Sequence, residues 1–123
     1  MALYGEDYVL VISQKCHVDK TLDLQKIYLK KQQSMKNCHI IPLNLTPQNP
    51  VREHFIHSIL QVDDKHWNRY WDKMHFKGVK APHVVRTNEA MAAYIITIPG
   101  AIGYIPEAMI SRNMNIISRF ELD

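Results

Sequence analysis

The sequence predicts an α/β fold within a single domain, and three observations support this prediction. The chain has 123 residues and is 46% hydrophobic, which is enough to bury a core without cross-links. Short apolar runs rich in valine and isoleucine alternate with longer segments whose apolar residues recur every three or four positions. No internal repeat or low-complexity tract divides the chain.

The first three elements follow a strand, helix, strand pattern. Residues 7–13, DYVLVIS, form a compact apolar run that is typical of a buried strand. Residues 20–31 place apolar side chains at helical spacing, and residues 38–45, CHIIPLNL, provide a second strand. We expect one right-handed crossover between them, which would make the two strands parallel.

The two cysteines of the chain bear directly on this crossover. Cys16 follows the first strand and Cys38 precedes the second, so parallel strands would hold the two thiols at opposite ends of the sheet. A strand of five or six residues is about 17 to 20 Å long. This length exceeds the limit of roughly 7 Å between the α-carbons of a disulfide. We therefore expect two free thiols, and no feature marks either of them as a catalytic nucleophile.

A loop leads from the second strand into the next predicted helix. Asn49 is a preferred N-cap residue and Pro50 suits the first helical position. Val51, Phe55 and Ile59 then fall on one face of the helix. The helix start follows the carboxyl end of a strand, where open α/β sheets tend to bind ligands. Its free N–H groups make it a candidate anion site, and an ordinary capped helix is the alternative.

Two histidines lie on the opposite face of this helix. His54 and His57 are three residues apart and could share a metal ion. The sequence places no third ligand beside them, so we expect solvent-facing histidines and no metal site.

A second helix is predicted directly afterwards. Asp63 can cap it, and Trp67, Tyr70, Trp71 and Met74 recur at steps of three and four residues. Such an aromatic stripe indicates core packing, and an exposed face that binds a partner is the alternative.

The last third of the chain supplies a third helix and two strands. Thr87 can cap the helix, and Pro99 and Gly100 end it. Residues 101–105 and 114–120 then read as the final strands.

Four stretches carry a family resemblance, and they occur in the family's order. They are VLVIS with LQKIYLKK, IIPLNL with PVREHFIHSIL, HWNRYWDKMHFKG, and TIPGAIGYI, and together they span residues 8–105. The sequence resembles the small, single-lobed members of the type 2 periplasmic substrate-binding superfamily, which are similar to the phosphate-binding component of ABC importers.

The resemblance implies both a fold and a function. The implied fold is a single three-layer lobe over residues 1–123, with helices around a mixed, mostly parallel sheet of about four or five strands. The implied function is that of a non-enzymatic, exported module that resides in the periplasm, needs no cofactor and binds a small oxyanion such as phosphate. The opening residues show no leader pattern, so the chain is either cytosolic or a mature exported protein, and export rests on the resemblance.

The resemblance also suggests why two glycines interrupt the stretch TIPGAIGYI. Gly100 would allow the left-handed backbone that ends the preceding helix. Gly103 would let a neighbouring segment approach the strand closely. Both roles are structural.

The sequence departs from the family pattern at the proposed anion loop. Phosphate-binding relatives carry a loop like R-x-E-G-S-G-T-R there. Aligning the R-E pair that begins at Arg52 puts Asn49 at the serine, Pro50 at the glycine, Val51 at the threonine and Leu45 at the arginine. Three donors are lost, so the resemblance implies weak or altered anion binding.

A chain of this length offers only half of a two-lobed cleft, which leaves three explanations open. The exposed face binds a ligand weakly, a second copy completes the cleft, or the face contacts another periplasmic protein in a signalling role that has lost ligand binding. We expect the contact face in the loops of residues 13–17 and 44–52, both at carboxyl ends of strands. The candidate ligand-binding residues are Ser13, Gln14, Asn44, Thr46, Gln48, Asn49 and Arg52.

Composition excludes several other functions. The net charge of +3 is mild and the basic residues are spread along the chain, which argues against nucleic-acid binding. No apolar run reaches the roughly 20 residues of a membrane span. No acid–base pair, nucleophile constellation or phosphate loop can be assembled, so we expect no enzyme.

Overall fold

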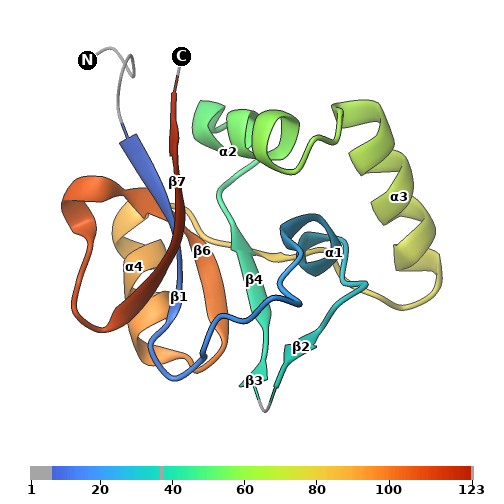
Figure 1. The fold of residues 1–123 in the computed structure, drawn as a ribbon. Helices are drawn as coiled ribbons and strands as arrows, with labels where there is room; N and C mark the ends of the chain where they lie inside the picture. The colour runs from blue at the N-terminus through green and yellow to red at the C-terminus, as the bar shows by residue number, and fades with distance from the viewer. Residues whose placement is uncertain (1–6, 37, 123) are drawn as a thin grey trace.

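A mixed five-stranded sheet forms the centre of the molecule in the computed structural model, which describes residues 7–36 and 38–122 (Figure 1). The strand order is β5-β4-β6-β1-β7, and β2 and β3 form a separate two-stranded hairpin. This agrees with the α/β class predicted from the sequence. The strands are β1 (Asp7–Ser13), β2 (Ser34–Met35), β3 (Cys38–His39), β4 (Ile41–Asn44), β5 (His83–Val84), β6 (Ala101–Pro106) and β7 (Met114–Glu121).

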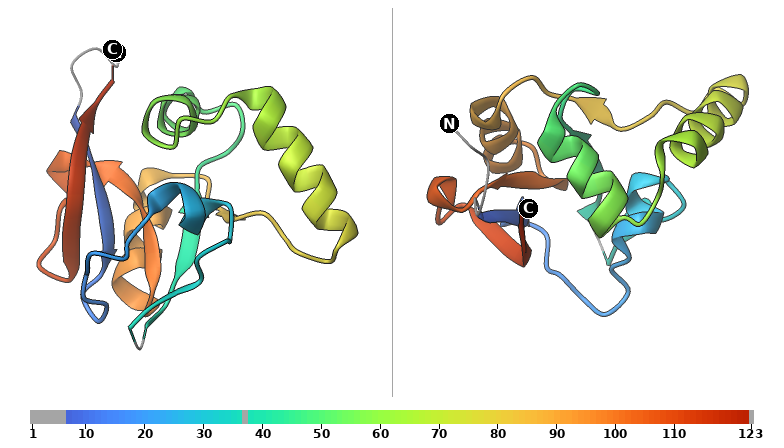
Figure 2. Two further views of the ribbon diagram at one scale, coloured as in Figure 1. Left: turned by 45° about the vertical axis from the view of Figure 1, so that its right-hand side comes forward. Right: turned by 90° about the horizontal axis from the view of Figure 1, so that it is seen from above.

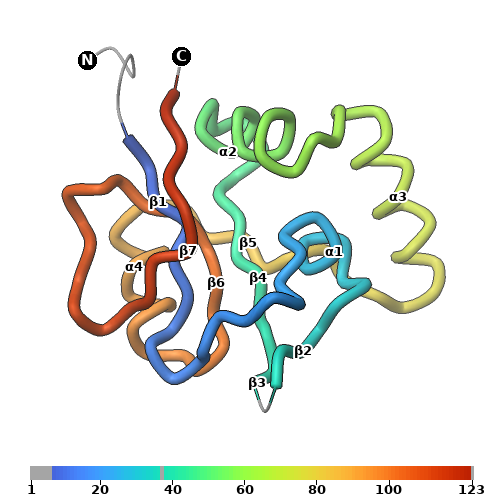
Figure 3. The backbone as a smooth tube through the Cα atoms, viewed as in Figure 1, coloured from blue at the N-terminus to red at the C-terminus, as the bar shows by residue number. Residues whose placement is uncertain are grey.

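The direction of β1 differs from the prediction. β4 pairs in parallel with β5 and β6, whereas β1 pairs antiparallel with both β6 and β7. β1 and β4 therefore run in opposite directions with β6 between them, as the backbone trace shows (Figure 3). The expected parallel crossover between these two strands is wrong, because β6 lies between them and is parallel to β4 but antiparallel to β1.

The antiparallel direction of β1 also overturns the prediction of free thiols. The carboxyl end of β1 and the amino end of β4 now lie at the same end of the sheet. Cys16 and Cys38 meet there and form a disulfide, with their α-carbons 5.7 Å apart. The cross-link ties the loop after β1 to the hairpin that precedes β4.

Helices cover both faces of the sheet and make three layers (Figure 2). Helix α4 (Asn88–Thr97) packs on one face, beside Gly103. Helix α1 (Leu24–Tyr28) and helix α2 (Pro50–His54), which continues as the π-helical turn η1 (Phe55–Ile59), pack on the other. On this face Phe55 stacks on Tyr104 with ring centroids 4.2 Å apart. The three-layer arrangement expected from the resemblance is confirmed.

The sequence located most helix starts correctly. Asn49, Asp63 and Thr87 cap α2, α3 (Asp64–Phe76) and α4, and each side chain accepts a backbone N–H bond. Helix α1 is shorter than the predicted segment and is capped by Asp23. Among the described residues, none of the helices has the length and apolar composition that crossing a bilayer requires.

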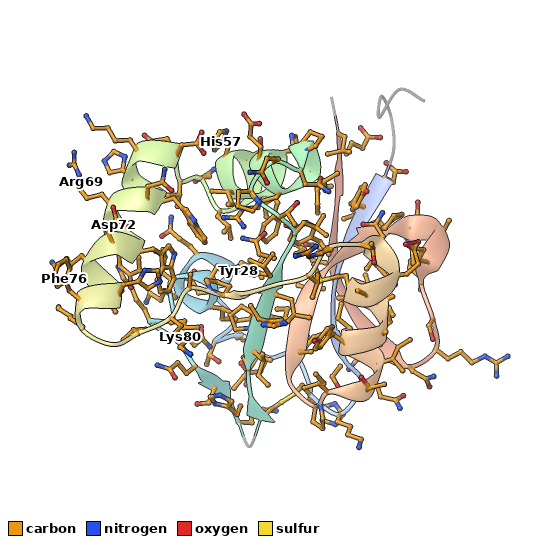
Figure 4. The ribbon with its side chains drawn as sticks, turned by 180° about the vertical axis from the view of Figure 1, so that it is seen from behind. Tyr28, His57, Arg69, Asp72, Phe76 and Lys80 are labelled. Carbon is orange, nitrogen blue, oxygen red and sulfur yellow. A yellow bond between two sulfur atoms is a disulfide. The ribbon has the colours of Figure 1, made fainter. Side chains whose placement is uncertain are left out.

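The aromatic stripe of α3 belongs to the core, as predicted. Trp67 and Trp71 are buried, and Tyr70 and Met74 are half-buried against them. Phe76, at the end of the same helix, is 97% exposed and projects from the edge of the molecule (Figure 4). The helix therefore packs through one side only.

Both glycines of the TIPGAIGYI stretch have the structural roles expected of them. Gly100 has a φ of +90°, and a β-carbon there would lie 1.8 Å from the carbonyl oxygen of His39. A β-carbon at Gly103 would lie 2.5 Å from the sulfur of Met91 on α4. The first position requires a left-handed backbone, and the second allows α4 to pack closely on the sheet.

We predict that Gly100→Ala lowers the free energy of unfolding by about 2–5 kcal/mol. The left-handed backbone costs roughly 1–2 kcal/mol for alanine, and the clash with a backbone carbonyl adds about 1–3 kcal/mol. Gly78→Ala is the matched control, because Gly78 has a φ of +79° with nothing within 4 Å of its β-carbon position. Urea denaturation should show a clearly smaller loss for the control; equal losses would contradict the close approach at Gly100.

We also predict that the disulfide contributes about 2–4 kcal/mol to stability, since it restrains the unfolded chain. The double variant Cys16→Ala/Cys38→Ala should unfold at lower urea concentration than the wild type. Addition of dithiothreitol should shift the wild-type curve towards that of the variant and leave the variant itself unchanged. A wild-type curve that does not respond to the reductant would refute the pairing.

Candidate functional site

The candidate loop begins where β4 ends, and a buried tyrosine holds its first residues. Asn44 is buried, and its side-chain oxygen accepts a hydrogen bond from the Tyr104 hydroxyl. The same hydroxyl accepts a bond from the backbone N–H of Leu45 at 3.2 Å. Burial raises the pKa of Tyr104, so its hydroxyl stays protonated and keeps both bonds. The start of the loop is thereby fixed from within the core.

Asn44 also carries a donor that the described protein atoms do not use. Its side-chain nitrogen is fully buried and has no hydrogen-bond partner within residues 7–36 and 38–122. Its backbone carbonyl, in contrast, accepts a 2.8 Å bond from the N–H of Val85. Asn44 therefore connects the loop to the sheet and does not lie on the surface.

The middle of the loop turns back on itself at Asn49. The N–H of Asn49 donates to the carbonyl of Thr46 at 3.0 Å, which closes a turn. The Asn49 side-chain oxygen then accepts the N–H of Val51 at 2.8 Å. Pro50 has no N–H, and the N–H of Val51 is bonded to Asn49. The first two positions of the helix therefore offer no free N–H. Gln48 is exposed and Thr46 is half-buried.

The charged group of the loop is also engaged within the protein. The Arg52 guanidinium donates from Nη1 to the carbonyl of Leu45 at 2.8 Å. It also lies over the Trp67 ring, 6.0 Å from the ring centroid. Partial burial lowers the pKa of Arg52, although the group stays charged at neutral pH. Arg52 therefore bridges the two ends of the loop and packs against α3.

Ser13 and Gln14 do not join this loop. Ser13 ends β1 beside the start of β6, and β6 starts level with Ile41, the first residue of β4. Asn44 lies at the other end of β4, so the two predicted loops sit at opposite ends of the sheet. Ser13 is moreover buried, whereas Gln14 is exposed. The single contact face expected from both loops is wrong, because it assumed that β1 and β4 are parallel.

Tyr104 and Trp67 also contact the loop, although the sequence pattern indicated only a strand position for the first and a core position for the second. A usable pattern did exist for Tyr104, because a buried tyrosine hydroxyl generally needs a hydrogen-bond partner. The sequence could not show that this partner would be Asn44.

A cluster of potential metal ligands forms beside the loop, with a composition that the sequence did not predict. Ligand atoms of Glu53, His57 and Asp64 all lie within 4.8 Å of one another. A hydrogen bond of 2.9 Å joins His57 Nε2 to Asp64. His54 takes no part and instead stacks on Phe120. Two carboxylates and one imidazole could bind a divalent cation. The hydrogen bond between His57 and Asp64 also accounts for the arrangement of these side chains when no metal ion is bound.

Comparison with solved structures identifies the fold. The chain superposes on an ABC-type phosphate transport receptor from Vibrio cholerae with a TM-score of 0.67 and 18% identity. It superposes on a putative phosphate ABC transporter substrate-binding protein with bound phosphate from Clostridium perfringens with a TM-score of 0.70 and 13% identity. Each match covers 95% of this chain, which spans 47% and 46% of the respective neighbours. No family model and no curated protein matches the sequence.

The chain therefore has the fold of one lobe of phosphate ABC transporter substrate-binding proteins, as the sequence motifs indicated. It spans about half the length of the two solved neighbours.

Proposed function

We propose that the protein is a non-enzymatic binding module whose loop of residues 44–52 contacts its target, and that it binds small oxyanions such as phosphate only weakly. The fold supports the general class, because both neighbours are transport binding proteins. The bond from the Arg52 guanidinium to the Leu45 carbonyl carries the proposal. This bond ties Arg52, the single positively charged residue among residues 44–52, to the backbone of the loop itself.

The remaining loop donors favour the same conclusion. A tight oxyanion site needs charged donors together with several free N–H groups or hydroxyls. Here Pro50 contributes no N–H, and the N–H of Val51 is bonded to Asn49. Thr46, Gln48 and the side-chain nitrogen of Asn49 are left as uncharged donors. Such contacts near the surface compete with water and are weakened by salt.

Export to the periplasm is part of the proposal. The disulfide between Cys16 and Cys38 supports it, because disulfides form and persist in oxidising compartments such as the bacterial periplasm. The likeness to ABC-type transport receptors points to the same compartment.

Protein contact through the same loop is the second candidate function. Pro47, Gln48 and Pro50 are exposed at the loop, and none of them carries a charge. A neutral, proline-restrained surface suits a second copy of the chain or another periplasmic protein better than a free anion. Loss of ligand binding would then leave a module that acts only through its partner.

Thermal melting in phosphate tests the proposal. With a dissociation constant of about 10 mM or weaker, 10 mM phosphate adds no more than about 0.4 kcal/mol and raises Tm by less than about 3 °C. A site with a dissociation constant of about 10 µM would add roughly 4 kcal/mol and raise Tm by more than about 10 °C. A shift of that size would contradict weak binding. Sodium chloride of equal ionic strength is the control.

A variant that restores the family's donors sharpens the test. Asn49→Ser/Pro50→Gly/Val51→Thr supplies a hydroxyl pair and an additional N–H at the helix start. We expect phosphate to raise the Tm of this variant by more than it raises the Tm of the wild type. If the variant folds and shows no gain, the missing donors do not explain the weak binding.

Sedimentation of the wild type tests the second candidate function. If a second copy of the chain is the partner, we expect the wild type to be a dimer and the Gln48→Arg variant to be a monomer.

A further inference from the structure

We propose that the hollow between α1 and α3 binds a small organic anion that has an aromatic or other apolar body and a carboxylate or sulfonate head. This hollow is separate from the loop of residues 44–52 and has a volume of about 610 Å³. Pockets for small molecules commonly have volumes of roughly 300–1,000 Å³. The hollow is lined by Gln25, Leu29, Gln61, Val62, Asp63, His66, Arg69, Tyr70 and Lys73.

The floor of the hollow is apolar and held in place by hydrogen bonds. Leu29 is buried, and Val62 and Tyr70 are half-buried. The Tyr70 hydroxyl donates to the Leu29 carbonyl at 2.5 Å, which joins α3 to α1. Gln25 donates to the carbonyl of Leu60 at 2.9 Å, which joins α1 to the end of η1. The walls are thus formed before a ligand arrives, and the Tyr70 ring offers an aromatic surface for its body.

The rim of the hollow carries two positive charges that form no ion pair with a carboxylate among the described residues. Arg69 and Lys73 lie one helical turn apart on the exposed side of α3, and Figure 4 shows Arg69 extending from that helix. Within residues 7–36 and 38–122, neither takes part in an ion pair. Lys31 does not line the hollow, but its nitrogen lies 5.6 Å from the centroid of the Tyr70 ring. Like charges at this helical spacing repel, so a bound anion would relieve the repulsion.

The one acidic residue that lines the hollow is already bonded. The Asp63 carboxylate accepts the backbone N–H of His66 and contacts its ring, each at 2.8 Å. These hydrogen bonds lower the pKa of Asp63, so it stays charged as the cap of α3. Arg69 can grip a carboxylate or sulfonate with two parallel N–H bonds, and Lys73 adds a second charge. An apolar floor with two cations at its edge therefore matches an amphiphilic anion.

Fluorescence titration with two related dyes tests this site on the wild-type protein. The charged probe is 8-anilinonaphthalene-1-sulfonate, and N-phenyl-1-naphthylamine has the same rings without the sulfonate. We expect saturable binding of one charged probe per chain, with a dissociation constant of about 10–100 µM. The uncharged probe should bind at least about tenfold more weakly. An excess of 2-naphthoate should displace the charged probe, because a carboxylate satisfies the same site.

Matched variants separate this site from unspecific dye binding. Arg69→Gln/Lys73→Gln should weaken binding of the charged probe by at least about tenfold and leave the affinity for the uncharged probe unchanged. Arg86→Gln/Arg112→Gln removes two exposed cations that line no part of the hollow and should bind both probes like the wild type. Circular dichroism confirms that each variant is folded. The proposal is overturned if wild-type binding does not saturate, if both dyes bind equally, or if the two double variants behave alike.

Discussion

The hydrogen bond from Arg52 to the Leu45 carbonyl is the interaction on which the account of this loop depends. It joins Leu45, the first residue after β4, to Arg52 in the first turn of α2, seven positions further along the chain, and the same guanidinium packs on Trp67 of α3. The Arg52 side chain thus holds the two ends of the loop together. A guanidinium in this position stabilises the lobe and commits one of its five N–H donors to the protein backbone, which separates this loop from one that wraps an oxyanion.

Beneath that contact, Tyr104 gives the loop a fixed base. Its hydroxyl joins Asn44 and the N–H of Leu45, and its ring lies against Phe55 of the turn that follows α2. These three residues come from the end of β4 and from the segment that follows it. One buried side chain of β6 therefore positions the loop and its helix together, and the disulfide restrains the opposite end of the sheet.

Local features of the fold could be predicted from the sequence, whereas strand direction could not. Asn49 was recognised as a helix cap because capping depends on a few adjacent residues. The roles of Gly100 and Gly103 followed from the family motif. The direction of β1 depends on which strand lies beside it, and apolar periodicity contains no such information. The errors at Cys16 and at Ser13 both follow from the assumption that β1 and β4 are parallel. The contact between Arg52 and Leu45 depends on the path of the whole loop, which no local sequence pattern specifies.

Urea unfolding of Arg52→Ala with and without 10 mM phosphate tests the central claim most directly. If Arg52 closes the loop, the substitution lowers the free energy of unfolding by about 1.5–3 kcal/mol, the usual value for a hydrogen bond to a charged group. The small response to phosphate should then be the same as in the wild type. The account is contradicted if the variant is as stable as the wild type and a clear phosphate response of the wild type is lost.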